Sequence, residues 1–337
     1  MMQRAIARVI EGGDLTESEA TQVMIEIMTG IATEAQIGAL LAGLRIKGET
    51  STEIASFAGV MRHYAVKIHP DMPQTLVDTC GTGGDRAQTF NISTTAAFVA
   101  AGAGVCVVKH GNRGVSSRCG SADLLEHLGV HLTLSPEAVC SILHRLNIAF
   151  LYAPDHHTAM RTVSNARKEI GTRSVFNLLG PLTNPAGADA QLLGVYDAAL
   201  TETIADVLRL LGTRRAMVVH GNGTDEITAG ITKISELANG EIRNYSLDSD
   251  DFGIGRADLS LLKGGYPKDN AAIVRGVLNG TGGAARDVVL LNAGATIYLG
   301  GKAASLAQGI SAAEVSIDSG RAREKLDLLV EATRCAR

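Results

Sequence analysis

The sequence has no excess of positive charge: 31 Lys and Arg residues stand against 35 Asp and Glu, and the formal net charge is −4 at pH 7. A negative net charge does not attract nucleic acid or an anionic membrane surface to the molecule as a whole. The sequence also has no apolar run approaching about 18 residues, the length that a membrane-spanning helix needs. We therefore expect no nucleic-acid or membrane partner, and any anion site must be built locally.

Cysteine is sparse as well, and its spacing does not match a zinc site. The five residues form no C-x-x-C pair; they are Cys80, Cys106, Cys119, Cys140 and Cys335. An odd number of scattered cysteines indicates free thiols in a reducing compartment. Residues 1–30 contain no basic segment followed by an apolar one, as a secretion signal would have. These features favour a cytoplasmic location.

The first 70 residues have the pattern of a small helical domain. Residues 2–10 are expected to form one helix, and capping pairs mark the start of three more: Thr16 with Glu19, Thr33 with Gln36, and Thr50 with Glu53. A buried stripe at helical spacing is formed by Ile37, Leu40, Leu41 and Leu44. We expect residues 1–70, joined by part of 165–190, to form a domain that serves packing or dimerisation.

After Pro73 the pattern changes to short strands that alternate with helices. Strands are expected at 75–77, 105–108, 148–151, 192–196 and 216–219, and helices include 94–103 and 201–211. This alternation predicts an α/β domain over 71–337 with a mostly parallel sheet, and ligands bind such sheets at the carboxyl ends of the strands. Residues 239–291 suggest further strands and turns without chemistry, with GTGGA at 280–284 as a plain turn.

The loop that follows the first strand is rich in glycine and hydroxyl groups, and residues 78–94 read DTCGTGGDRAQTFNIST. Backbone N–H groups of a glycine-rich loop that leads into a helix commonly bind phosphate. The stretch is not a P-loop, because it lacks lysine, nor a dinucleotide fingerprint, because Arg86 stands where the third glycine would be. Asp85 can accept hydrogen bonds from ribose hydroxyls, and Ser93 or Thr94 is expected to cap the helix.

Two further loops follow strands of the same predicted sheet. In KHGNRGVSSRCGSADLLEHLG, Lys109 and Arg113 flank flexible glycines, an arrangement that suits a polyphosphate. Hydroxyl groups follow at Ser116, Ser117 and Ser121, and Ser121 is expected to cap a helix over 122–128. The third loop, HGNGTDEIT, contains Asp225 and Glu226. Adjacent carboxylates repel phosphate unless Mg²⁺ lies between them, so this pair predicts a magnesium site.

The segment between the second and third loops contributes an arginine and a pair of histidines. Arg167 presents a planar guanidinium that suits a carboxylate. His156 and His157 have no third ligand at metal-binding spacing, so we interpret them as pocket lining or helix surface.

The motifs GTGGD, NIST, KHGNRGVSS with GSADLLE, FNLLGPLTNPA and the DE pair together resemble the motif set of the anthranilate phosphoribosyltransferase family. The resemblance runs over nearly the whole chain, to the NAGATIYLGG and IDSGRA segments. It implies a homodimer, formed through the helical domain, in which each subunit pairs a small helical domain with a larger α/β domain. The substrates would meet in the cleft between the two domains.

The resemblance also implies roles for individual residues. Phosphoribosyl pyrophosphate (PRPP) would be held by Gly81, Gly84, Asp85, Thr89, Asn91, Ile92, Ser93, Thr94, Lys109, His110, Gly111, Asn112, Arg113, Gly114, Val115, Ser116, Ser117 and Ser121. Anthranilate would be contacted by Gly81, Asn112 and Arg167. The Mg²⁺ ligands would be Ser93, Asp225 and Glu226.

The implied reaction is displacement of pyrophosphate from C1 of PRPP by the amine of anthranilate, the second step of tryptophan biosynthesis. No residue is assigned as a general base, because an aromatic amine is already neutral at pH 7. One alternative is a nucleoside phosphorylase of the same fold, which binds free phosphate and does not need the DE pair. The other is a non-catalytic nucleic-acid-binding relative, which would show a basic face and eroded motifs.

Overall fold

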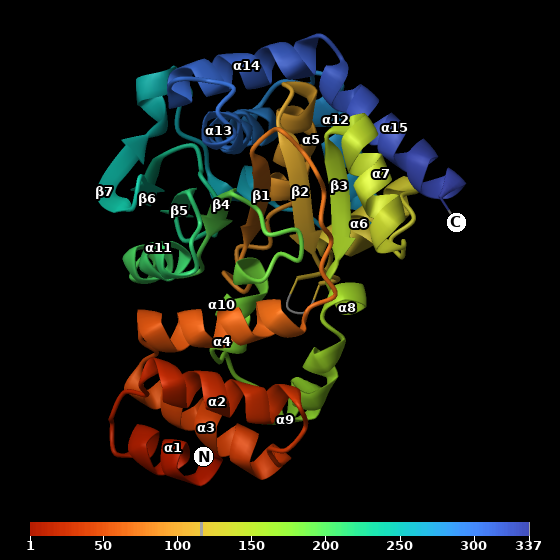
Figure 1. The fold of residues 1–337 in the computed structure, drawn as a ribbon. Coiled ribbons are helices and arrows are strands. Elements are labelled where there is room, and N and C mark those ends of the chain that lie inside the picture. Colours follow the sequence, from red (N-terminus) through yellow and green to blue (C-terminus); the bar gives the residue numbers. More distant parts are fainter. Residues whose placement is uncertain (115–116, 337) are drawn as a thin grey trace.

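The computed structural model describes residues 1–114 and 117–336, and Figure 1 shows a small helical part below a larger α/β part. The helical part begins with α1 (Met2–Ile10), α2 (Glu17–Met28), α3 (Glu34–Lys47) and α4 (Ser51–Tyr64). Thr16, Thr33 and Thr50 cap the last three helices through complete capping boxes, which confirms the prediction. The capping residues alone were therefore enough to locate these helices.

The larger part is built on one sheet of seven strands in the order β3-β2-β1-β4-β5-β6-β7. The strands are β1 (Leu76–Gly81), β2 (Cys106–Gly111), β3 (Ile148–Tyr152), β4 (Ala190–Gly194), β5 (Arg215–Gly221), β6 (Ile231–Ala238) and β7 (Glu241–Asp248). The first five are parallel, whereas β6 and β7 are antiparallel, so the prediction of a mostly parallel sheet is confirmed. The chain order reverses between β1 and β4, and crevices at such reversals bind ligands in open α/β sheets.

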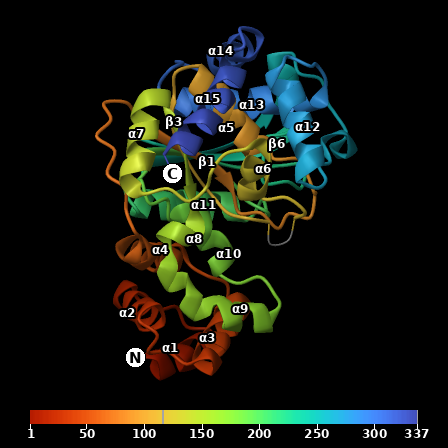
Figure 2. The same ribbon diagram turned by 90° about the vertical axis from the view of Figure 1, so that its right-hand side faces the viewer.

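Among residues 1–114 and 117–336, eleven further α-helices surround this sheet or connect it to the helical part. They are α5 (Ile92–Gly102), α6 (Ser121–Leu128), α7 (Pro136–Leu146), α8 (Ala153–His156), α9 (Ser164–Ile170), α10 (Phe176–Leu179), α11 (Leu200–Leu210), α12 (Pro267–Leu278), α13 (Ala284–Leu299), α14 (Leu306–Asp318) and α15 (Arg321–Cys335). In Figure 2, α8, α9 and α10 lie between the two parts, and α9 reaches down beside α3. Asn165 Nδ2 on α9 donates to Glu34 Oε1 at 3.0 Å, which ties this connection to the helical part.

Alternating residues of the strands face two different cores. Leu192 and Met217 belong to a core shared with α5, α13 and α15, whereas Leu193 and Val218 belong to one shared with α1–α4 and α11. The helical part is thus packed continuously onto one face of the sheet. No helix among residues 1–114 and 117–336 has the length and hydropathy needed to cross a membrane.

Three local predictions were wrong. Residues 239–291 contain only one strand, β7; residues 267–278 and 284–291 lie in α12 and the start of α13, and Pro267 begins the first of these helices. The 281–283 turn leads directly into α13. The helix after the glycine loop is capped at Asn91, so Ser93 and Thr94 lie within its first turn. Ser121 is the first helical residue of α6, and its cap is Gly120, whose N–H donates to Asp123.

Candidate active site

The glycine loop at the end of β1 is held against the carboxylate loop at the end of β5. Gly83 N donates to Asp225 Oδ2 at 2.7 Å, and Asp225 N donates to Asp85 Oδ2 at 3.3 Å. A Cβ atom at Gly81 would overlap the Asp225 carboxylate, so only glycine fits there. Two loops separated by about 140 residues in sequence therefore form one surface at the reversal point of the sheet.

Asp225 and Glu226 form the acidic centre of this surface. Glu226 is buried and its Oε1 accepts from Ser93 N at 3.1 Å, while Asp225 is partly buried. Burial, reinforced by the nearby Asp85, raises the pKa of Asp225 to about 7. Burial and the Asp225 charge raise the pKa of Glu226 well above its usual value. Two carboxylates held this close favour a cation between them.

Lys109 is the only cation recorded within hydrogen-bond reach of Ser93 among the described residues. Its Nζ donates to Thr79 O and to Ser93 Oγ, the latter at 3.2 Å, and the side chain is buried. It also lowers the pKa of Glu226 against the larger effect of burial. Lys109, Ser93 and Glu226 therefore lie together at the N-terminus of α5, where the helix dipole favours an anion.

The loop after β2 is held by Asp123 and Glu126. Arg113 pairs with Glu126 at 2.7 Å and with Asp123 at 3.1 Å, so its guanidinium is occupied within its own loop. Gly114 N donates to Asp123 Oδ2, and Ser121 Oγ donates to Asn112 O. The Ser117 hydroxyl donates to Cys119 O, and a Cβ at Gly111 would overlap Ser121 Oγ. Val115 and Ser116, both predicted PRPP ligands, lie outside the described residues.

The remaining predicted PRPP residues surround the start of α5. Thr89 pairs with Lys263 in an isolated antiparallel bridge, and Asn91 Nδ2 donates to Cys119 O at 3.2 Å. Ile92 and Thr94 are buried in the first turn of α5, so their side chains serve the helix packing. Within this group, Asn91 and Ser93 have partly exposed side chains.

His110 and His157 lie next to each other, with ring centroids 5.1 Å apart and ring planes inclined by 59°. Both are buried, and burial lowers the pKa of each, that of His157 to about 4, so both are neutral at pH 7. In the described structure the Nε2 atoms of both rings have no hydrogen-bond partner. His156 is buried too, and its Nδ1 contacts Val66 O at 2.7 Å. Of the two interpretations given for His156 and His157, helix surface is excluded because both side chains pack inside, and pocket lining stays a prediction.

Arg167 lies on α9, with its guanidinium 5.4 Å from the centre of the Phe176 ring. Partial burial lowers its pKa slightly from the usual value, and it forms no ion pair among the described residues. An arginine in this state is available to a carboxylate ligand.

Sequence reasoning missed Arg173, six residues further on. Its Nη2 donates to Gly84 O, and its guanidinium stacks on Tyr196, 4.3 Å from the ring centre. Tyr196 N in turn donates to Thr82 Oγ1 at 3.1 Å, so the two residues together hold the glycine loop. The only signal in the sequence was a second arginine in the same segment, ARKEIGTR.

Two amides from the C-terminal half were missed as well. Asn270 Nδ2 donates to Asn91 Oδ1 at 2.8 Å. Asn292 holds the residue after Glu226 by both of its backbone groups: it accepts from Ile227 N at 3.1 Å and donates to Ile227 O at 2.7 Å. Asn270 stands in the polar stretch PKDNAA, which is typical of a helix surface, whereas Asn292 stands in the apolar run VVLLNAGATIYL, which indicates burial but does not identify its partner.

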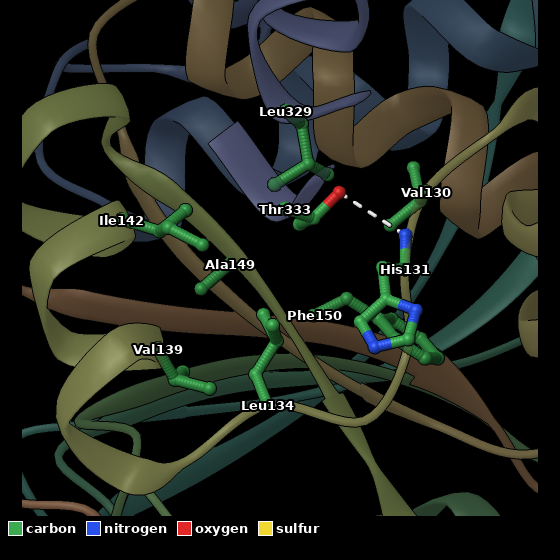
Figure 3. Close-up of a pocket in the computed structure, with 9 residues that line it drawn as sticks. All are labelled: Val130, His131, Leu134, Val139, Ile142, Ala149, Phe150, Leu329 and Thr333. Atoms are coloured by element: carbon green, nitrogen blue, oxygen red, sulfur yellow. Dashed lines mark hydrogen bonds between the residues drawn. The ribbon is translucent and has the colours of Figure 1, made fainter. Parts of the chain in front are cut away.

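The small pocket in Figure 3 does not belong to this site. It lies between α7, β3 and α15, and its lining is mostly apolar, with Val139, Ile142, Phe150 and Leu329 among the side chains. His131 N donates to Thr333 Oγ1 at its edge. The space is no larger than a water molecule needs, so it cannot take a substrate.

Comparison with known families identifies the class of protein that this fold and site define. The glycosyl transferase helical bundle domain matches residues 3–65, and the glycosyl transferase a/b domain matches residues 73–323. The chain is 59% identical over 331 residues to the anthranilate phosphoribosyltransferase of Methanocorpusculum labreanum, covering 98% of this chain and 97% of that one. It is 55% identical to that of Moorella thermoacetica, with 98% of each covered. The chain belongs to the anthranilate phosphoribosyltransferase family.

Solved structures agree with this membership. The anthranilate phosphoribosyltransferase of Thermus thermophilus superimposes with a TM-score of 0.93 at 44% identity, covering 98% of this chain and 99% of that one. The Saccharomyces cerevisiae enzyme, solved in complex with PRPP and Mg, has a TM-score of 0.91 at 27% identity, covering 99% and 98%.

Proposed function

We propose that this chain transfers the 5-phosphoribosyl group of PRPP to the amine of anthranilate, giving N-(5-phosphoribosyl)anthranilate and pyrophosphate. This is the second step of tryptophan biosynthesis. The observation that carries the proposal is the meeting of the glycine loop, Lys109 and the Asp225–Glu226 pair at the reversal point of the sheet. Family membership adds the identity of both substrates.

The PRPP side of the site is the surface formed by the glycine loop, the start of α5 and the loop after β2. Lys109 and the backbone N–H groups at the N-terminus of α5 supply positive potential for the phosphates. Asp85 accepts hydroxyl hydrogen bonds, a role that suits ribose. The other PRPP residues expected from the resemblance keep these roles here as proposals, Val115 and Ser116 included.

Magnesium fits the donor set of Ser93, Asp225 and Glu226. Their hydroxyl and carboxylate oxygens are the hard ligands that Mg²⁺ prefers. Burial is the main cause of the raised pKa values of the two carboxyl groups, and repulsion between neighbouring carboxylates, which a bound cation would offset, adds to it. Among the described residues no group of three or more His, Cys, Asp and Glu side chains forms a complete metal site. That agrees with an ion held jointly by one or two carboxylates and by substrate phosphates. When bound, Mg²⁺ would stabilise the charge that grows on departing pyrophosphate.

Anthranilate binds, in this proposal, between Arg167 and the glycine loop. The guanidinium of Arg167 faces the carboxylate, while Gly81 and Asn112 line the approach to C1 of PRPP. The chain contributes mainly position: holding the neutral amine against C1 is worth about 7 kcal/mol or more. No residue is proposed as a general base.

The domain division and assembly are also proposals. Residues 1–70 with part of 165–190 form the helical domain, supported by the contact of α9 with α3, and 71–337 form the α/β domain. The chain would form a homodimer through the helical domain, where Ile10 and Ile46 are 68% and 87% exposed on the neighbouring helices α1 and α3. A cytoplasmic location is proposed from the free thiols.

The test is the loss of anthranilate fluorescence when the purified protein is mixed with PRPP and Mg²⁺. Turnover to a phosphoribosylated product is expected. Folded protein that leaves anthranilate unchanged, but splits a nucleoside when supplied with free phosphate, would contradict the proposal in favour of a phosphorylase.

A further inference from the structure

Asn270 is a fully enclosed polar side chain on α12, only 1% exposed, far in sequence from the PRPP loops. Its Oδ1 accepts from Gly265 N at 2.7 Å, and its Nδ2 donates to Asn91 Oδ1 at 2.8 Å. A Cβ at Gly264 would overlap both this amide oxygen and the backbone of Phe90. The amide therefore sits tightly between the 264–265 turn and the start of α5.

The orientation of the Asn270 amide is forced, and it forces that of Asn91. Gly265 N can only donate, so the oxygen of Asn270 must face it and the NH₂ group must face Asn91. Asn91 must then present its own oxygen to Asn270. Two contacts with Cys119 agree: its thiol donates to Asn91 Oδ1 at 3.5 Å, and its carbonyl accepts from Asn91 Nδ2 at 3.2 Å.

The same segment also holds the backbone just before Asn91. Phe90 N donates to Leu262 O and Gly264 N donates to Gln88 O, both at 2.9 Å. Residues 262–270 thus fix the path of the chain into α5 and the direction of the first side chain there. Rotation of the Asn91 amide by 180° would exchange a donor for an acceptor on the ligand side.

We propose that Asn270 is a positioning residue for PRPP binding, which acts by fixing the amide orientation of Asn91. The inference rests on the proposed assignment of Asn91 to PRPP. Asn270 touches no substrate in this account, so its effect must pass through Asn91.

The first test is Asn270→Asp. The carboxylate keeps an acceptor for Gly265 N but presents an oxygen, in place of a donor, to Asn91 Oδ1. We expect the KM for PRPP to rise about tenfold, because one hydrogen bond is lost and two oxygens repel each other. The KM for anthranilate should change by less than about twofold. Asn279→Asp, the same change at an exposed position just after α12, is the control and should leave both constants unchanged.

The second test repeats the substitution in an Asn91→Ala background. If Asn270 acts through Asn91, the double variant should differ from Asn91→Ala by less than about twofold in the KM for PRPP. An undiminished tenfold rise there, or no rise in the wild-type background, overturns the proposal. If Asn91→Ala leaves the KM for PRPP unchanged, Asn91 does not bind PRPP and the positioning proposal is overturned. Turnover by the wild-type protein in the same assay would still support the proposed transferase activity. Should Asn270→Asp fail to fold, Asn270→Ala carries the same pair of measurements.

Discussion

Two groups of residues at the carboxyl edge of the sheet are built in opposite ways. The ligand loops, residues 82–91, 109–121 and 224–226, include partly exposed side chains and even non-glycine residues with positive φ, Arg86 and Gln88. The buried supports, Asp78, Asn270 and Asn292, are at most 1% exposed and hydrogen-bonded. Bonds within the loops, such as Gly83 N to Asp225, hold part of this surface, and the buried side chains add support from outside the loops. The comparison teaches that residues which need not touch substrate share the control of the site's geometry.

The strongest way to break this comparison is to remove the charges of the ligand loops. Asp225→Asn with Glu226→Gln keeps size and shape but removes two carboxylates. We expect turnover to fall by about 10²-fold or more, with a higher Mg²⁺ concentration needed for half-maximal rate. Rates measured against Mg²⁺ at saturating substrates check this. If the pair only repelled stray anions, the variant would bind PRPP better, and its magnesium curve would match the wild type.

Replacing a buried support should change the Mg²⁺ requirement more weakly than replacing the carboxylates, and it should also lower the stability of the protein. Asn292→Ala leaves Ile227 N and O without their partner, which should cost about 2 to 4 kcal/mol of unfolding free energy. It should also raise the Mg²⁺ requirement several-fold, because Glu226 adjoins Ile227. Thr296→Ala, one turn further along α13, is the control: its hydroxyl bonds only Asn292 O. An equal magnesium shift in both variants would mean that Asn292 acts through general destabilisation.

Asp78, a buried support, should make the stability of the protein depend on pH. Burial raises the pKa of this carboxyl from 3.8 to about 6, against the opposing charge of Lys109. Asp78 binds its proton more tightly in the folded protein than in the unfolded chain. Its contribution to the free energy of unfolding is therefore complete below about pH 4 and is lost as pH rises through 6. Between pH 5 and pH 8, the free energy of unfolding measured with urea should fall by about 1 to 3 kcal/mol more in the wild type than in Asp78→Asn. Parallel pH curves for the two proteins would contradict this account of Asp78.

The smallest effect is expected where a support is itself partly exposed. Tyr196→Leu removes the ring on which Arg173 stacks and should raise the KM for PRPP about threefold, because the Gly84 carbonyl is held less firmly. Tyr196→Phe keeps the ring and should match the wild type. If both variants behave alike, stacking on Tyr196 does not hold the loop.

The ligand loops could be found from sequence and the supports could not, for a physical reason. GTGGD, the lysine near the end of β2 and the DE pair are local patterns whose residue types already indicate a chemistry. Asn270 and Asn292 act through contacts 179 and 65 residues away, so no local window contains the partner. Capping boxes at Thr16, Thr33 and Thr50 located three helices because both members of each pair lie within four residues.

The same distinction explains the errors. Ser93 and Ser121 were plausible caps by residue type, yet each helix starts earlier, because the chain enters it along contacts with distant segments. Within 239–291, the start of α13 was missed because this helix is buried on most sides from Val288 to Leu299, so its sequence shows no single apolar stripe. The contact of Arg113 with PRPP is not one of these errors and stays a prediction; in this structure Asp123 and Glu126 hold its guanidinium.

Calorimetric titration of PRPP into the wild-type protein, with and without Mg²⁺, tests the central claim most directly. The claim is that the ligand loops form one site for PRPP together with magnesium. One PRPP should bind per chain in the presence of Mg²⁺, and binding should weaken at least about tenfold when the metal is withdrawn or when Asp225 and Glu226 are replaced by their amides. Equal affinity with and without Mg²⁺, or no binding by folded protein, would contradict the account.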